Sequence, residues 1–363
     1  MKKKRVLIID DSAIVRDILS RELPRHPDIE VVAAAMDPYI AREKIARFPV
    51  DVILLDIEMP RMDGLTFLRH LMKSHPLPVI VLSSLVDGGN QASMEALELG
   101  AIDVVAKPSG PYSVVEVLAQ LVERIRAIDL VDFERVKQNA MQLQERTTQQ
   151  AAPRNKILTR IRTTNNLIAV GASTGGTHAL EVLFRAYDRI MPPTLVVIHM
   201  PEKFTASYAR RLNDICSPTV KEAVDGEIAL PGCVYVAPGN YHMTVKTFGA
   251  EYKLVMHTAP KLHGQRPAVD HLFDSVAESV GRNGFGILLT GMGRDGAAGL
   301  LRMHQTGAYT ICQDEESCIV FGMPKEAIAL GAADRVLPLD GIYQHLTSRL
   351  DGQMIDTRKT VHD

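Results

Sequence analysis

Residues 50–60 of the chain read Val-Asp-Val-Ile-Leu-Leu-Asp-Ile-Glu-Met-Pro, a short apolar run that ends at an aspartate. The run Val52–Leu55 is apolar at every position, whereas a strand with one solvated face alternates apolar and polar residues. The run Val79–Leu82 has the same unbroken character. Strands of this kind are covered on both faces, which is typical of a parallel sheet with helices on either side.

The first third of the chain repeats this pattern on both sides of the run. Short apolar runs, which predict strands, alternate with amphipathic stretches, which predict helices. The predicted strands are Val6–Ile9, Glu30–Ala34, Val50–Leu55, Pro78–Leu82 and Ile102–Ala106. The predicted helices are Ala13–Leu23, Pro38–Arg47, Gly64–Ser74, Asn90–Leu99 and Tyr112–Ile125. Five βα repeats favour an N-terminal, five-stranded, doubly wound α/β domain.

A change in composition separates this region from the rest of the chain. From about Lys137 to Thr164 the sequence is rich in Gln, Arg and Thr, which is typical of an exposed linker with a helical first part. A length of 363 residues suits two domains. We therefore predict a first domain at 1–126, a linker at 127–164, a second domain at 165–350 and a polar, frayed tail at 351–363.

The second domain also has an α/β pattern. Its predicted strands are Asn166–Val170, Leu195–His199, Cys233–Ala237 and Gly286–Thr290, and a hairpin joins Met243–Phe248 to Tyr252–His257. Its predicted helices are Thr177–Tyr187, Val269–Val280, Ala297–Thr306 and Lys325–Ala332. This order favours a second doubly wound α/β scaffold with an added antiparallel hairpin.

Composition bounds the class of protein. The formal net charge of −2 does not favour wholesale binding to nucleic acid or to an anionic membrane. The apolar run after the basic N-terminus breaks at Asp10, too early for a signal peptide, and no apolar run has the length of a membrane span. The four cysteines have no metal-binding spacing and are interpreted as buried thiols. We expect a cytoplasmic protein without membrane insertion.

Polar residues follow the predicted strands of the first domain. Asp10 and Asp11 come after the first strand and Asp56 after the third, and the carboxyl ends of neighbouring parallel strands meet in one crevice. Three carboxylates there need a cation, and Mg²⁺ prefers oxygen ligands. Ser83 and Lys107, which end the next two strands, supply a hydroxyl donor and a positive charge for a phosphoryl group. Each aspartate alone also suits a turn or an N-cap.

Residues Lys4 to Arg126 resemble the receiver domain of response regulators. The resemblance lies in Asp10-Asp11, Asp56-Ile-Glu-Met-Pro60 with Asp63-Gly64, Ser83, and Lys107-Pro108. It implies that Asp56 accepts a phosphoryl group and that the Glu58 carbonyl joins the three aspartates in holding Mg²⁺. It leaves open whether Ser83 or Ser84 contacts the phosphate. Many receivers carry an aromatic switch residue where this chain has Val104, which puts signalling through a rotating ring in doubt.

The second domain contains Gly171-Ala-Ser-Thr-Gly-Gly176 between a predicted strand and a predicted helix. This G-x-S-x-G pattern is typical of a sharp turn that exposes a nucleophilic serine, here Ser173. A glycine-rich nucleotide loop or an N-cap serine has a similar sequence. His199 ends one predicted strand and Asp295 follows another, and they supply the base and the orienting acid that a serine nucleophile needs. Other histidines, among them His242 and His257, suit surface or satisfied polar roles.

Residues Asn166 to Leu350 closely resemble the catalytic domain of chemotaxis protein-glutamate methylesterases, the CheB family. The resemblance lies in segments 171–176, 199–201, 234–238, 266–270 and 289–296. It implies a triad of Ser173, His199 and Asp295, with the Met292 N–H in the oxyanion hole. The implied reaction is hydrolysis of glutamate γ-methyl esters, and deamidation of glutamines, on methyl-accepting chemotaxis receptors without a cofactor. The implied phosphoryl donor is the chemotaxis histidine kinase.

Two other kinds of output domain remain as alternatives. A nucleotide- or partner-binding module would use the glycine-rich segment 171–176, but this segment lacks a full G-x-G-x-x-G and a following Walker-type lysine. A DNA-binding output would need a basic helix-turn-helix after the linker, and the sequence has no such pattern.

Overall fold

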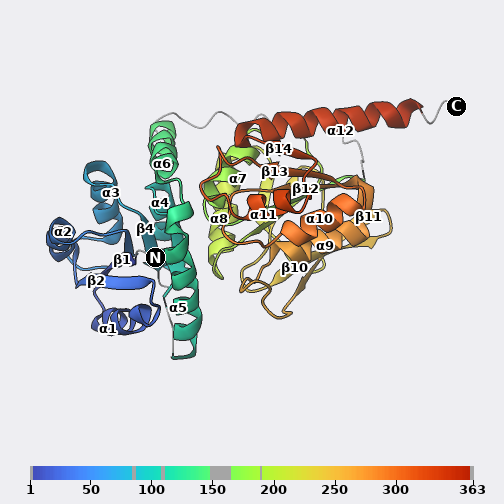
Figure 1. Ribbon diagram of the computed structural model, residues 1–363. Helices are drawn as coiled ribbons and strands as arrows, with labels where there is room; N and C mark the ends of the chain where they lie inside the picture. The colour runs from blue at the N-terminus through green and yellow to red at the C-terminus, as the bar shows by residue number, and fades with distance from the viewer. Residues whose placement is uncertain (1–2, 84–86, 108–110, 148–164, 189, 360–363) are drawn as a thin grey trace. The chain divides into compact units, whose positions relative to one another are not determined.

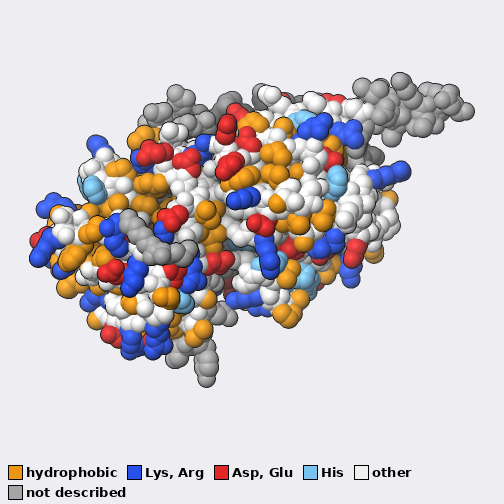
Figure 2. Space-filling view, viewed as in Figure 1, with side chains coloured by type: hydrophobic (Ala, Val, Ile, Leu, Met, Phe, Trp, Pro, Cys, Tyr) orange, Lys and Arg blue, Asp and Glu red, His pale blue; other side chains and the backbone are white. Residues whose placement is uncertain are grey.

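The computed structural model describes residues 3–83, 87–107, 111–147, 165–188 and 190–359. Ser84, Pro108 and the second part of the predicted linker lie outside the described residues. The chain forms two compact units, and the main division falls between helix α6 (Phe133–Thr147) and strand β6 (Leu167–Ala172). In the part of the chain that is described, no helix is both long enough and apolar enough to cross a bilayer. On the face seen in Figure 2, acidic and basic side chains are interspersed.

The first unit contains the predicted five-stranded parallel sheet (Figure 1). Its strands lie in the order β2-β1-β3-β4-β5. Its strands are β1 (Lys4–Ile9), β2 (Ile29–Ala35), β3 (Val52–Asp56), β4 (Val79–Ser83) and β5 (Asp103–Ala106). Its helices are α1 (Ala13–Glu22), α2 (Pro38–Arg47), α3 (Gly64–Ser74), α4 (Asp87–Glu98), α5 (Pro111–Arg126) and α6 (Phe133–Thr147), with short 3-10 helices η1 (Leu23–Arg25) and η2 (Ala127–Leu130).

The interior positions of β3 and β4 in this sheet explain why these two strands have unbroken apolar runs. Every residue of β3 and β4 is buried. Alternate residues such as Val52 and Leu54 pack in one core with Leu19 of α1 and Leu121 of α5. The intervening Ile53 and Leu55 are buried on the opposite face. Burial on both faces holds the carboxyl ends of β1, β3 and β4 in a fixed relation, which positions the polar residues that follow them.

Helix α6 lies inside the segment that was predicted to be a linker. Its Val136 and Ala140 are buried, and the Ala140 methyl group lies against Gly100 at the end of α4. The helical first part is therefore confirmed, but this part packs onto the first unit instead of lying exposed. Two apolar residues four positions apart lie on the same face of a helix, and burial of this face docks α6.

The second unit contains a seven-stranded parallel sheet in the order β14-β13-β12-β6-β7-β9-β8 and a separate antiparallel hairpin. The sheet strands are β6 (Leu167–Ala172), β7 (Thr194–Ile198), β8 (Thr219–Glu222), β9 (Cys233–Val236), β12 (Gly284–Leu288), β13 (Tyr309–Gln313) and β14 (Arg335–Leu337), and the hairpin is β10 (His242–Phe248) with β11 (Glu251–His257). The helices are α7 (Gly176–Arg185), α8 (Phe204–Ile215), α9 (Val269–Ser279), α10 (Ala297–Gln305), α11 (Met323–Ala329) and α12 (Ile342–Lys359), with η3 (Gly281–Asn283) and η4 (Leu339–Gly341).

The strand order of this sheet locates its ligand crevice. From β6 the chain builds outward through β7 and later returns to β12 on the other side of β6. The order therefore reverses between β6 and β12, and in doubly wound sheets ligands bind outside the carboxyl ends of strands at such a point. The hairpin, α9 and α10 share one core with the sheet, including Val245, Phe273 and Leu300. That core fixes the start of α9 beside the crevice.

Several elements were not predicted. Strands β8 and β14 have four and three residues at the two edges of the sheet, too few to show a period. Strand β13 was also missed, because its two buried polar residues, Thr310 and Gln313, interrupt the apolar run. Helix α12 continues to Lys359, so the predicted frayed tail after Asp351 is helical as far as it is described.

Three imidazole rings pack together where the hairpin meets α9. The ring centroids of His242 and His271 are 4.1 Å apart, and that of His257 is 5.3 Å from each of them. His242 is fully buried; its Nδ1 accepts a hydrogen bond from the Ala268 N–H (3.2 Å), and its Nε2 donates to the Pro260 carbonyl (3.2 Å). The satisfied polar role predicted for His242 is confirmed, and the ring fixes the chain that enters α9.

This buried ring predicts a loss of stability in acid. Burial, reinforced by the neighbouring His271, lowers the pKa of His242 to about 4, against about 6.5 for an exposed histidine. Between these values the unfolded chain binds more protons, so the free energy of unfolding falls as the pH falls from 6.5 toward 4. We expect the melting temperature of the protein to drop by several degrees across this window.

Comparison with the variant His242→Asn isolates this contribution, because carboxylates titrate in both proteins. The variant should melt at a lower temperature at pH 7, since it loses two buried hydrogen bonds, but its melting temperature should depend less on pH between 6.5 and 4. Thermal unfolding followed by circular dichroism measures both slopes. Parallel slopes in wild type and variant would show that His242 does not carry the effect.

Candidate active site and receiver site

Ser173 lies in the turn between β6 and α7, at the carboxyl edge of the sheet. Its N–H donates to the Thr290 carbonyl (3.0 Å), and its own carbonyl accepts from the Gly176 N–H (2.7 Å). The N-cap of α7 is Gly175, which has a φ of 79° that a glycine adopts without strain. Ser173 is therefore not the N-cap residue, and its hydroxyl is available to other partners.

The structure brings Ser173, His199 and Asp295 together. His199 Nδ1 is 3.1 Å from Ser173 Oγ, and His199 Nε2 is 2.7 Å from Asp295 Oδ2. The side chains of His199 and Asp295 are almost fully buried. Because a carboxylate accepts hydrogen bonds, we assign the proton of the neutral ring to Nε2, which leaves the Nδ1 lone pair facing the serine hydroxyl. This arrangement can activate the hydroxyl as a nucleophile.

The first turn of α9 holds the Asp295 carboxylate. Val269 N–H donates to Oδ2 (2.7 Å) and Asp270 N–H donates to Oδ1 (3.0 Å). Burial acts to raise the pKa of Asp295, but the hydrogen bond and charge of His199 and these two N–H groups outweigh it, so the net pKa is lowered. The carboxylate is thus kept ionised and oriented toward His199.

The segment after β12 approaches the serine closely. A Cβ atom on Gly291 would lie 2.8 Å from Ser173 Cβ and 2.3 Å from Met323 Sδ, so only glycine fits there. The N–H of the next residue, Met292, donates to no acceptor among the described residues. A free N–H group next to the serine suits the stabilisation of an oxyanion.

In the first unit, the structure brings Asp10, Asp11 and Asp56 together at the carboxyl ends of β1 and β3. One carboxylate oxygen from each lies within 4.8 Å of the others. Lys107 Nζ is 2.7 Å from Asp56 Oδ2 and 3.0 Å from Asp10 Oδ2. Apart from this lysine, neither of those two buried oxygens has a hydrogen-bond partner among the described residues. The donor set is all oxygen, which fits a hard divalent cation such as Mg²⁺.

Burial and the neighbouring charges shift the pKa values of two groups in this cluster. Burial raises the pKa of Asp56 to about 6, although the Lys107 ammonium acts in the opposite direction. Burial also acts to lower the pKa of Lys107, but Asp56 and Asp10 outweigh it and the net pKa is raised. Lys107 is therefore a permanent positive charge beside Asp56. Three close carboxylates with one ammonium leave an excess of negative charge that a divalent cation would balance.

Ser83, Glu58 and Val104 have other contacts in the structure, and the predicted contact of Ser83 with phosphate stays a prediction. Ser83 ends β4 and its hydroxyl accepts a hydrogen bond from Ser93 of α4 (2.7 Å). Glu58 donates its N–H to Asp56 Oδ1 (3.1 Å), and the predicted role of its carbonyl stays a prediction. Val104 is buried on β5. Gly64 is tightly packed, because a Cβ there would lie 2.1 Å from the Asp56 carbonyl oxygen.

Comparison with known proteins reveals relatives that match nearly the whole chain. A protein named protein-glutamate methylesterase/protein-glutamine glutaminase 2, from Syntrophus aciditrophicus (strain SB), is 50% identical over 348 residues, which are 95% of this chain and 99% of that protein. The chain belongs to the CheB methylesterase family. A further relative, from Yersinia pseudotuberculosis, is 45% identical over 355 residues, which are 96% of this chain and 98% of that protein.

Separate family models match the two units. The receiver domain of response regulators matches residues 6–119, and CheB methylesterase matches residues 168–346. The crystal structure of the catalytic domain of Thermotoga maritima CheB methylesterase is 39% identical and covers 51% of this chain and 98% of that domain, with a TM-score of 0.50. The resemblance inferred from the motifs and the predicted α/β architecture of both domains are confirmed.

Sequence reasoning missed residues that support the triad in this CheB family member. Asp270 is buried, and its Oδ1 accepts from Gly299 N–H (2.6 Å) at the start of α10, while its Oδ2 lies 3.1 Å from His263 Nε2. Asp270 therefore ties together the two helices that flank Asp295. Its place in the first turn of a predicted helix, followed by an apolar stripe, was the available signal, but an aspartate there is also an ordinary helix-terminal residue.

Proposed function

We propose that this protein hydrolyses the γ-methyl esters of glutamate side chains, and deamidates glutamine side chains, on methyl-accepting chemotaxis receptors. The observation that carries the proposal is the hydrogen-bonded chain from Ser173 through His199 to Asp295, in a protein 50% identical to a named methylesterase and glutaminase. The reaction class follows from the chemistry, since a serine with a base attacks acyl carbon.

Ser173 Oγ attacks the ester carbonyl carbon while His199 Nδ1 takes the hydroxyl proton. The imidazolium that forms is stabilised by Asp295, and the oxyanion receives the Met292 N–H. The proton then passes to the methoxy oxygen, and methanol leaves the acyl-enzyme. Water, deprotonated by the same nitrogen, releases glutamate and restores the serine. A glutamine amide gives ammonia in place of methanol. These groups supply base, acid and oxyanion donor, so we propose that hydrolysis uses no cofactor.

The receiver domain would control this activity. We propose that an Asp56 carboxylate oxygen attacks the phosphorus of a phosphohistidine on a chemotaxis histidine kinase. The new P–O bond forms as the P–N bond breaks and the kinase histidine leaves, with Lys107 and Ser83 contacting the phosphoryl oxygens. Asp10, Asp11, Asp56 and the Glu58 carbonyl would hold Mg²⁺, which supplies positive charge to the transferring group. The substrates and the kinase belong to the cytoplasmic side of the membrane, where we place the protein, without membrane insertion or nucleic-acid binding.

The proposal is tested by incubating the full-length protein with receptor membranes whose glutamates carry radioactive methyl esters. Volatile radioactive methanol should be released, and a small phosphodonor with Mg²⁺ should increase the rate. Membranes without enzyme give the background. Release of methanol at background rate under both conditions would reject the proposed activity.

Removal of residues 1–164 provides a test of receiver control. A tether holds the receiver at high local concentration near the catalytic domain, where it would exclude a large receptor helix until phosphorylation weakens its docking. We expect the truncated enzyme to release methanol several-fold faster than the unphosphorylated full-length protein, and to ignore the phosphodonor. A truncated enzyme that is no faster would favour a receiver that activates directly.

A further inference from the structure

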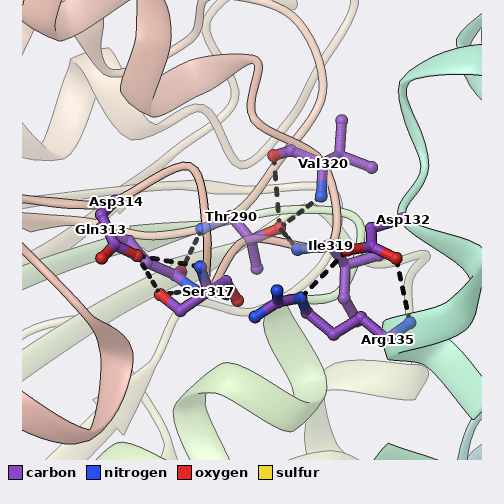
Figure 3. A network of polar contacts seen from close by, with 8 residues as sticks. All are labelled: Asp132, Arg135, Thr290, Gln313, Asp314, Ser317, Ile319 and Val320. Atoms are coloured by element: carbon purple, nitrogen blue, oxygen red, sulfur yellow. Dashed lines mark hydrogen bonds and ion pairs between the residues drawn. The ribbon is translucent and has the colours of Figure 1, made fainter. Parts of the chain in front are cut away.

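Thr290 is a buried polar residue two positions after the end of β12, and it contacts the turn that carries Ser173. The residue is 1% exposed. In Figure 3 the Thr290 hydroxyl faces the main chain of Ile319 and Val320. The Gln313 side chain approaches the Thr290 backbone N–H from the other side. A fully buried hydroxyl needs all of its partners, so its position is strongly determined.

Thr290 holds the main chain on both sides of the nucleophile. Its carbonyl accepts from the Ser173 N–H (3.0 Å). Its hydroxyl oxygen lies 3.0 Å from the Thr174 carbonyl oxygen and 3.3 Å from the Val320 carbonyl oxygen, and we assign its single proton to the nearer acceptor, Thr174. The Ser173 N–H and the Thr174 carbonyl lie on either side of the Ser173 side chain in the sequence of the backbone. Because one residue provides both contacts, the turn that carries Ser173 Oγ is placed relative to the end of β12 and not only by its own helix.

The same hydroxyl holds the loop after β13. Its oxygen accepts from the N–H groups of Ile319 (3.1 Å) and Val320 (2.9 Å). Two acceptor bonds and one donated proton satisfy a hydroxyl completely. The Ile319 side chain then lies against Gly175, where a Cβ would be only 2.7 Å from Ile319 Cβ. The loop after β13 is thus fixed against the nucleophile turn.

This loop in turn fixes the segment that carries the oxyanion donor. The Val320 carbonyl accepts from Gly291 N–H (3.0 Å), and the Gly291 carbonyl accepts from the N–H groups of Gly322 (3.1 Å) and Met323 (2.9 Å). Gly291 is followed directly by Met292. The Thr290 hydroxyl is therefore hydrogen-bonded to two segments: the turn that carries Ser173, and the loop after β13 that holds Gly291.

We propose that Thr290 is a positioning residue for the esterase reaction: its hydroxyl sets the distance between Ser173 Oγ and the Met292 N–H. The Thr290 backbone is held in turn by Gln313, whose Oε1 accepts from the Thr290 N–H (2.8 Å) and whose Nε2 donates to the Ser317 carbonyl (2.8 Å). The inference rests on the proposed function, because it assigns Thr290 to the same acyl transfer. A misplacement of about 1 Å between nucleophile and oxyanion donor is enough to lower a rate on the order of 100-fold.

The test replaces Thr290 with valine and with serine in the full-length protein. Thr290→Val keeps the branched shape and removes the hydroxyl, so we expect kcat for methanol release to fall about 10- to 100-fold while KM changes little. Thr290→Ser keeps the hydroxyl and should retain kcat within a few-fold of wild type. The wild type is measured in parallel. A wild type that releases no methanol would reject the proposed function, whereas an active wild type with an equally active valine variant would reject only this inference.

Thr310→Val is the matched control. Thr310 is also a fully buried threonine of the same sheet, but its hydroxyl bonds to Asp334 (3.0 Å) away from the triad. Both valine variants should lose thermal stability, and only Thr290→Val should lose kcat. A wild-type kcat for Thr290→Val, an equal loss of kcat in the two valine variants, or a serine variant as slow as the valine variant would each overturn the proposal.

Discussion

Replacing Ser173 with alanine is expected to lower methanol release from methylated receptors by about 10⁴-fold or more. The hydroxyl lies 3.1 Å from His199 Nδ1, and no other nucleophile is bonded to that nitrogen among the described residues. Without it no acyl-enzyme forms, and the remaining oxyanion donor cannot supply a nucleophile. The rate is measured with radiomethylated receptor membranes.

Replacement of the other two triad residues should lower the rate of methanol release by different amounts. His199→Ala should be nearly as inactive as Ser173→Ala, because the base is lost. Asp295→Asn should lose less, since the amide oxygen still accepts from Val269 or Asp270 N–H and only the orientation and charge of the imidazole suffer. A double variant should be no slower than the slowest single variant, because the three residues act as a unit.

Ser279→Ala is the control for removal of a serine hydroxyl. That hydroxyl donates to the Val245 carbonyl (3.0 Å) in the same unit and lies on α9 away from the triad. Both alanine variants should melt within a few degrees of wild type, since each loses about one hydrogen bond. Near wild-type methanol release by Ser173→Ala would remove this serine as the nucleophile, whatever the activity of the control.

The three triad residues could be predicted because the end of an apolar run in the sequence shows where a β-strand ends. Ser173, His199 and Asp295 each follow directly, or within a few residues, an apolar run, and parallel strands carry such positions to one edge. The same logic located Asp10, Asp56 and Lys107. For both sites the candidate residues came from chemistry at the carboxyl ends of β-strands, and the structure places them within hydrogen-bonding or ion-pairing distance.

The supporting residues were not predictable, for a physical reason. Thr290 acts through partners about 30 and 116 positions away, and Asp270 acts through Gly299 on another helix. Such contacts depend on how elements pack, and no local pattern distinguishes a buried threonine from an exposed one. The docking of α6 was missed for the same reason, since the buried Ala140 packs near Gly100, which lies 40 positions earlier in the chain.

Replacing Asp56 with asparagine is expected to abolish phosphorylation of the protein by a small phosphodonor in the presence of Mg²⁺. Asparagine has nearly the same shape and can still accept the Glu58 N–H at Oδ1 (3.1 Å), so the loop should keep its conformation. It lacks the carboxylate oxygen that faces Lys107 Nζ at 2.7 Å, which is the atom expected to attack phosphorus. Incorporation of radioactive phosphate should fall to background, and the wild-type label should be lost in alkali, as an acyl phosphate is.

Asp63→Asn is the matched control for this change of carboxylate to amide. Asp63 caps α3 by accepting the Thr66 N–H (2.8 Å), and asparagine is an equally good cap, so this variant should be labelled like wild type. Asp56→Asn should also keep its basal methanol release while losing the response to the phosphodonor, because its catalytic domain is unchanged. Equal labelling of Asp56→Asn and wild type would place the phosphoryl group on another side chain, and the aspartate cluster around Lys107 would then need a different role.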